Sequence, residues 1–160
     1  MALQFSRETD LRIEELTKRY GDRHACLLPA LALAQAEFGS LTHEVMELVD
    51  ERLGIPAESV LSTSTFYSML HLRPVGKYHV QVCGNVACFL RGCDSVLAAV
   101  SRELGVGPGG TTADGQFTLS TVECLAACGT APVLMVKEDL YEGMTPEGAV
   151  ALVRKLRGEP

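Results

Sequence analysis

Two closely spaced pairs of cysteines constrain this chain more than any other feature of its sequence. Cys83 and Cys88 form the pattern C-x4-C, Cys124 and Cys128 form C-x3-C, and residues 89–123 separate the pairs. Two loops of this kind can bring four thiolates together. A binuclear iron–sulfur cluster requires four terminal ligands, two for each iron, and cysteine thiolates are its usual donors. The count and the pairing therefore predict a [2Fe-2S] centre.

Spacing alone does not separate this centre from structural zinc, which is often held by four cysteines in two close pairs. Gly84 and Gly129 directly follow two candidate ligands, and glycine lets a backbone approach closely and turn N–H groups toward sulfur. The helix expected to begin near Cys88 adds a dipole that favours an anion. These features favour a cluster modestly, and zinc stays an alternative. The C-x-x-C pattern of a thioredoxin-type dithiol does not occur in the sequence.

The other two cysteines, Cys26 and Cys93, have no paired spacing, and we expect both to be buried thiols of the core. Cys93 follows Cys88 by five residues, which is close enough for it to replace that ligand if Cys88 were lost. The histidines are scattered along the chain, and His79, which precedes Cys83 on a predicted strand, is expected to be structural.

The hydrophobic pattern changes near Pro74 and Gly76, which predicts an α+β fold with two domains. We expect a helical bundle over residues 1–72 and an α/β domain over residues 73–160. The helices of the bundle are expected at residues 8–20, 26–38, 42–53 and 57–65. The second domain has the order β-α-β-β-α with a possible extra strand, and its elements are expected at residues 77–83, 88–104, 116–122, 132–136, 139–142 and 146–156. The first β-α-β connection predicts a parallel strand pair.

Composition excludes several classes of function. The formal net charge of −6 argues against a nucleic-acid surface, which needs an excess of Lys and Arg. The apolar stretch from Cys26 to Ala36 is too short to span a bilayer, so we expect no direct membrane insertion. No secretory signal is visible near Met1, and we expect the chain to be cytoplasmic, where thiols stay reduced.

The segment Gly105–Gly110 matches the nucleotide-binding pattern G-x-G-x-x-G. A dinucleotide fingerprint follows a strand and opens a helix, whereas a helix is predicted before this segment and Pro108 interrupts it. We therefore expect a loop here rather than a phosphate site. No Ser-His-Asp set or HExxH motif occurs, and we expect no catalytic residues on this chain.

The residues around both cysteine pairs resemble the 24-kDa (NuoE-type) subunit of NADH-quinone oxidoreductase, or complex I, a thioredoxin-like [2Fe-2S] ferredoxin family. The similarity spans about residues 10–157. The matching segments are Thr65–Met69, Arg73–Tyr78, Val82–Cys83, Cys88–Gly92, Thr112–Phe117 and Val122–Pro132, with Leu28–Pro29, Gln35–Gly39 and Leu53–Pro56 in the helical part. The resemblance implies a thioredoxin-like second domain and a cluster held by Cys83, Cys88, Cys124 and Cys128, and it makes zinc a remote alternative.

The resemblance also implies a function and partners. The chain would be an electron-transfer subunit of an oxidoreductase and translocase, without a complete active site of its own. Its cluster would lie near the FMN of a partner flavoprotein subunit (NuoF-type) that binds NADH. Other peripheral-arm subunits would hold the chain at the inner membrane. Similar subunits serve NAD-linked hydrogenases and formate dehydrogenases, which stay alternatives, as does a zinc-stabilised interaction module of a different class.

The chain departs from the family pattern at three places. Gly110 stands where an acidic residue is frequent, Ala126 where glycine is frequent, and Lys137–Glu138 where asparagine is common. None of these removes a ligand. Ala126 lies between Cys124 and Cys128, so it can change the N–H arrangement near the sulfurs and with it the reduction potential.

Three large residues near the end of the helical part have two interpretations. Phe66, Tyr67 and Met69 either lie at the surface and provide docking area for a partner or belong to the core. The sequence favours neither.

Overall fold

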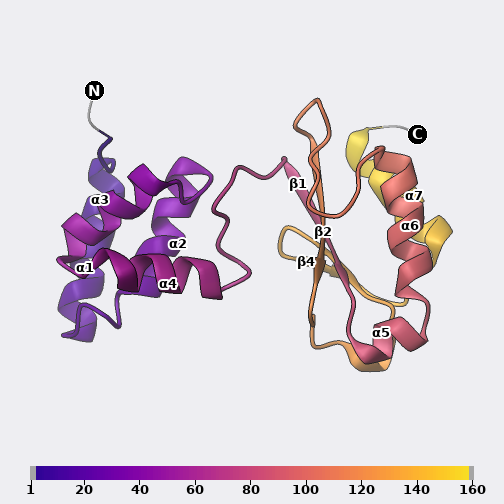
Figure 1. The fold of residues 1–160 in the computed structure, drawn as a ribbon, viewed down its shortest axis with the longest axis horizontal. Coiled ribbons are helices and arrows are strands. Elements are labelled where there is room, and N and C mark those ends of the chain that lie inside the picture. Colours follow the sequence, from indigo (N-terminus) through magenta and orange to yellow (C-terminus); the bar gives the residue numbers. More distant parts are fainter. Residues whose placement is uncertain (1–2, 159–160) are drawn as a thin grey trace. The chain divides into compact units, whose positions relative to one another are not determined.

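The computed structural model of the chain describes residues 3–158 (Figure 1). Within these residues the fold is mixed α/β, with seven α-helices, one short 3-10 helix and one four-stranded sheet. The chain divides into two compact units, with the division between Pro74 and Val75. Each unit has its own hydrophobic core.

The first unit contains four helices. Their bounds are α1 (Arg7–Tyr20), α2 (Leu27–Phe38), α3 (His43–Leu53) and α4 (Ala57–Phe66). Ser6 caps the start of α1 by accepting a hydrogen bond from the backbone N–H of Thr9. The first three helices end at glycines in the left-handed conformation, where a side chain would be strained. These are Gly21, Gly39 and Gly54, the residues at which the sequence predicts the helices to stop.

The interior of the first unit is apolar, and the segment at its end is not part of it. Residues from all four helices form the core, among them Ile13, Leu31, Val49, Leu53 and Val60. Phe66 and Met69 are 79% and 63% exposed, and Tyr67 is exposed as well. The structure therefore favours the surface interpretation of these three residues.

The second unit is built on one sheet with the strand order β2-β1-β3-β4. The strands are β1 (Tyr78–Cys83), β2 (Phe117–Val122), β3 (Leu134–Val136) and β4 (Asp139–Tyr141). β1 and β2 are parallel, as the sequence predicts, while β3 is antiparallel to both of its neighbours. Val80 and Val82 alternate along β1 and pack into the core with Phe117 and Leu119 of β2.

Three helices complete the second unit: α5 (Val86–Leu90), α6 (Cys93–Leu104) and α7 (Pro146–Arg157). Figure 1 shows α6 and α7 lying side by side next to the sheet, and Val96, Val100 and Val153 supply the core between them. Thr145 caps α7 by accepting from the N–H of Gly148, as its position before Pro146 indicates.

One predicted element is wrong. The apolar pattern over residues 88–104 predicts a single helix, but the structure divides this region into α5 and α6. Gly92 lies between them with φ of +89° and precedes the first residue of α6. A left-handed residue ends one helix and lets the chain turn before the next begins. The consequence is that Cys88 lies on a separate short helix.

The glycine-rich segment at residues 105–110 is a loop against β2. Gly105 ends α6 in the left-handed conformation. Gly109 donates its N–H to the carbonyl of Leu119 at 2.7 Å, and Leu119 donates back to Gly110 at 3.0 Å. These backbone groups therefore support the sheet, and the prediction of a loop is confirmed.

Replacing Gly92 tests the break between α5 and α6. An added Cβ meets nothing within 4 Å, so Gly92→Ala is penalised only by the left-handed backbone. We expect it to lower the free energy of unfolding by about 1–2 kcal/mol in urea denaturation followed by circular dichroism. Gly107→Ala is the control, because that site is equally open and its φ is not positive. Equal effects at the two positions would contradict the stated role of Gly92.

Candidate metal centre

The first cysteine pair lies where β1 leaves the sheet. Cys83 is the last residue of β1, and Cys88 lies in α5; both are buried. Asn85 begins α5 by accepting a hydrogen bond from the N–H of Val86 at 2.9 Å. The turn before α5 brings the chain back, so that the thiols of Cys83 and Cys88 interact directly.

The second pair lies in the segment between β2 and β3. Cys124 and Cys128 are both exposed, and Cys128 is the first residue of the 3-10 helix η1 (Cys128–Thr130). Ala126 lies between them in the left-handed conformation, with φ of +59°. Its backbone N–H donates to the sulfur of Cys124 at 3.2 Å. The loop therefore already directs one N–H group at a candidate ligand.

The parallel pairing of β1 and β2 brings the two pairs to the same end of the sheet. Cys83 is in register with Val122, which lies two residues before Cys124. Gly84 donates its N–H to the carbonyl of Val122 at 2.9 Å, and Cys83 donates its own to Val133 at 3.1 Å. Backbone bonds thus connect the first pair to the chain on both sides of the second.

The structure brings together part of the predicted ligand set. Cys83 and Cys88 interact directly, and Cys124 and Cys128 lie on the adjoining loop. Over residues 3–158 no group of three or more His, Cys, Asp or Glu side chains has the geometry to hold a metal ion. The four-cysteine set therefore stays a prediction.

The chemistry of the donors fits an iron–sulfur cluster. Burial acts to raise the pKa of the Cys83 thiol, but hydrogen bonds outweigh it and the pKa is lowered; the backbone groups of Asn85 and Leu125 provide the largest of these bonds. Leu125 belongs to the loop of the second pair, so that loop already stabilises a thiolate of the first. Backbone N–H groups directed at sulfur are the interactions that stabilise an anionic cluster.

Cys88 has the opposite balance. Burial, followed by the interaction with the Cys83 thiol, raises the pKa of Cys88 to about 11, although a hydrogen bond from the backbone of Val133 opposes this. In the chain without metal, Cys83 is thus the first of the two to become a thiolate. A metal ion removes the proton from a coordinating thiol, because the charge of the ion reverses the effect of burial.

The two remaining cysteines are buried, as expected. Cys26 donates its thiol to the carbonyl of Asp22 at 3.2 Å, and burial raises its pKa. Cys93 is the first residue of α6; burial and then the charge of Asp94 raise its pKa. Cys93 also lies near enough to Cys83 and Cys88 to interact with them electrostatically.

Sequence reasoning missed the backbone donors, whose direction follows from the folded loops. Two departures from the family pattern now have a physical description, because Ala126 and Lys137 are the two non-glycine residues among those described that have positive φ. Glycine and asparagine tolerate this conformation better than alanine and lysine do. The chain therefore carries a backbone strain at both positions.

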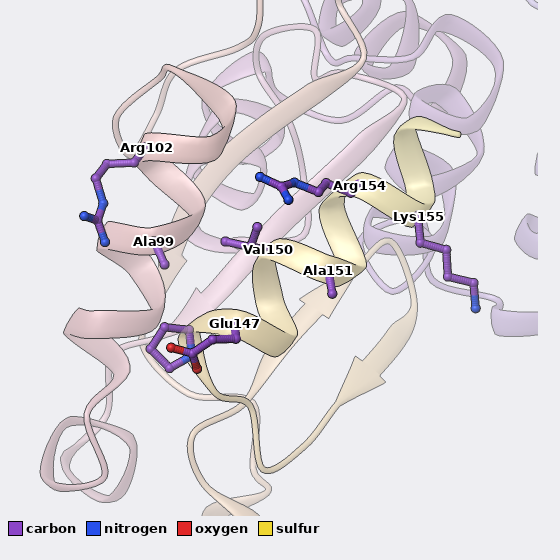
Figure 2. A pocket seen from close by; sticks show the side chains of 8 residues that line it. Ala99, Arg102, Glu147, Val150, Ala151, Arg154 and Lys155 are labelled. Atoms are coloured by element: carbon purple, nitrogen blue, oxygen red, sulfur yellow. The ribbon is translucent and has the colours of Figure 1, made fainter. Parts of the chain in front are cut away.

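A groove of about 730 Å³ between α6 and α7 lies outside the candidate centre. Ala99, Val150 and Ala151 contribute to its floor, and no cysteine lines it. Figure 2 shows Val150 pointing across the groove toward α6. Arg154, which also lines it, is held by both carboxylate oxygens of Glu103 at 3.0 and 2.9 Å. The groove offers no ligand for iron.

Over the part of the chain that the structure describes, none of the helices is long and apolar enough to cross a bilayer.

Comparison with known proteins identifies the class. The model of a family described as thioredoxin-like [2Fe-2S] ferredoxin matches residues 13–157. The chain therefore belongs to the thioredoxin-like [2Fe-2S] ferredoxin family, which also supports an iron–sulfur cluster over zinc.

Curated relatives narrow the comparison and confirm the resemblance seen in the sequence; all three described here are E-type subunits of NADH-quinone oxidoreductase. One of those of Rhizobium meliloti (strain 1021) is 42% identical over 145 residues, which cover 91% of this chain and 86% of the relative. The relative in Rickettsia bellii (strain RML369-C) is 40% identical over 91% of this chain and 89% of its own length. The relative in Mycobacterium bovis (strain ATCC BAA-935 / AF2122/97) is also 40% identical but longer, and the match covers 58% of it.

A solved structure supports the fold. An NAD+-reducing [NiFe]-hydrogenase chain in the air-oxidized state superposes with a TM-score of 0.72 at 19% identity, covering 82% of this chain and 23% of the hydrogenase chain. The fold of this chain is thus found as part of a larger polypeptide.

The exposure and pKa values of the cysteines predict an order of chemical modification in the reduced, iron-free chain. Iodoacetamide should label Cys124 and Cys128 first, because both are exposed, and Cys88 much later. Since the thiolate is the nucleophile, labelling of Cys88 should accelerate about tenfold per pH unit between about pH 8 and about pH 10. Peptide mass spectrometry after short pulses measures the order, with the urea-unfolded chain as control. Early labelling of Cys88 in the folded chain would contradict its burial.

Proposed function

We propose that Cys83, Cys88, Cys124 and Cys128 hold one [2Fe-2S] cluster, and that the chain transfers single electrons as a subunit of NADH-quinone oxidoreductase. The observation that carries the proposal is the parallel register of β1 and β2, which places both cysteine pairs at one end of the sheet. The family match and the relatives from NADH-quinone oxidoreductase support the same assignment.

The bound cluster would accept and release one electron at a time. The residues of this chain hold its ligands and surround them with N–H donors. Ala126 donates to the sulfur of Cys124, and backbone N–H groups of the second loop reach the first pair. Donors of this kind stabilise the more negative, reduced state and so raise the reduction potential.

The partner in this proposal is a flavoprotein subunit that binds NADH and FMN (NuoF-type). Hydride transfer delivers two electrons to a flavin, and a one-electron carrier near the flavin can remove them singly. Together with other peripheral-arm subunits, the flavoprotein would hold the chain at the surface of the inner membrane, on the cytoplasmic side. The division into a helical bundle domain over residues 1–72 and a ferredoxin domain over residues 73–160 is part of this proposal.

The surface next to Cys88 is suited to contact with that flavoprotein. Val86, Phe89 and Leu90 belong to the same five-residue helix as Cys88 and are 67%, 58% and 77% exposed. Large apolar side chains exposed together mark interaction sites more often than ordinary surface. Contact at α5 would exclude water and bring the flavoprotein directly over a cluster ligand.

Cysteine substitutions test the ligand set. We expect Cys124→Ser to abolish most cluster retention, because serine is a poor substitute for a thiolate ligand to iron. Cys26→Ser is the control, since Cys26 is buried in the other unit. Iron and sulfide analysis, together with the EPR spectrum of the dithionite-reduced protein, measures retention. Equal cluster loss in the two variants would refute the assignment.

Substitution on α5 tests the contact surface. Phe89→Asp should weaken binding to the flavoprotein about tenfold or more, as loss of an apolar contact at the centre of an interface does. Leu140→Asp on β4 removes a similarly exposed apolar side chain away from the cysteines and serves as the control. Isothermal titration with the separately purified flavoprotein gives both affinities. If the two variants bind equally well, α5 is not part of the interface.

A further inference from the structure

The segment that follows the second cysteine pair is held by hydrogen bonds along its whole length. From Thr130 to Val133, four consecutive carbonyls each accept one. Three of the donors are backbone N–H groups: Gly143 donates to Thr130 at 2.6 Å, Met144 to Pro132 at 2.9 Å, and Cys83 to Val133 at 3.1 Å.

The fourth donor is a side chain. The carbonyl of Ala131 accepts a hydrogen bond from Nε of Arg91 at 3.2 Å, across 40 positions of sequence. Ala131 is only 2% exposed, and a carbonyl removed from water needs a partner. The guanidinium therefore supplies the donor that the backbone does not provide at this position. A guanidinium keeps its charge at all ordinary pH values, so this bond does not depend on pH.

The two ends of this bond have equivalent places in the candidate centre. Arg91 follows Cys88 by three residues, and Ala131 follows Cys128 by three. The backbone N–H of Arg91 is itself bonded to the carbonyls of Ala87 and Cys88, both at 3.2 Å. Arg91 is thus fixed to the turn that carries one candidate ligand while its side chain holds the loop that carries another.

We propose that Arg91 is a positioning residue that sets the spacing of the two ligand loops, and through it the arrangement of the four sulfur ligands. This inference rests on the proposed cluster. The other connections between the loops are backbone bonds that substitution cannot remove, whereas the bond from Arg91 can be deleted without changing the backbone. Its loss would free the second loop to move relative to α5.

The first test uses the iron-free chain and does not depend on the cluster. Arg91→Met keeps the length of the side chain and removes the donor. Amide hydrogen exchange over residues 124–133 should become about tenfold faster, the factor that a hydrogen bond from a charged donor provides. Arg102→Met is a matched control, because Nε of Arg102 also donates to a carbonyl, that of Ala98 at 3.3 Å, but within its own helix. Unchanged exchange in Arg91→Met would overturn the proposal.

The second test uses the cluster-loaded chain. Arg91→Met should lose iron to a chelator about tenfold faster than the wild type, and its EPR g-values and midpoint potential should shift. Arg102→Met should behave as wild type, and Arg91→Lys, which keeps a charged donor, should recover part of the retention. Faster exchange without any change in g-values, potential or iron loss would show a bond that stabilises the loop but does not position ligands, and would overturn the proposal. Failure of the proposed function is read separately, from a wild-type chain that contains no iron and sulfide.

Discussion

The structure of the candidate centre depends on the parallel pairing of β1 with β2. Two strands that run in the same direction end at the same edge, so the residues that follow them meet there. Here the register of Cys83 with Val122 brings a C-x4-C turn and a C-x3-C loop side by side. The crossover through α6 makes this pairing possible, and the core between α6, α7 and the sheet holds it in place. The chemistry at this edge is a consequence of topology.

The surroundings of the thiols explain why this edge suits an iron–sulfur cluster. The second loop directs N–H groups at the sulfurs of Cys83 and Cys88, and Ala126 directs one at Cys124. An anionic cluster is stabilised by such donors, and its potential rises with their number and their alignment. The strained conformation of Ala126 is therefore of interest, because the same backbone geometry that carries strain also places an N–H near a ligand. Reduction potential and local stability are coupled at this residue.

Much of the fold follows from the sequence, for identifiable reasons. Gly21, Gly39 and Gly54 end helices because only glycine adopts the left-handed cap without strain, and this is visible in the pattern. The single helix predicted over residues 88–104 is wrong because the apolar periodicity continues through Gly92, where the backbone does not. The cysteine spacing predicts a four-thiolate site but leaves zinc open. The backbone donors and the bond from Arg91 arise from tertiary contacts over about 40 positions, which no local pattern contains.

The central claim is that four cysteines from two loops hold one binuclear cluster. Mössbauer spectroscopy of the full chain loaded with 57Fe, together with iron, sulfide and zinc analysis, tests it most directly. We expect two irons and two sulfides per chain, diamagnetic when oxidised and with a single unpaired electron after reduction, as the two irons of such a cluster share one added electron. A colourless chain with one zinc and no sulfide would contradict the account.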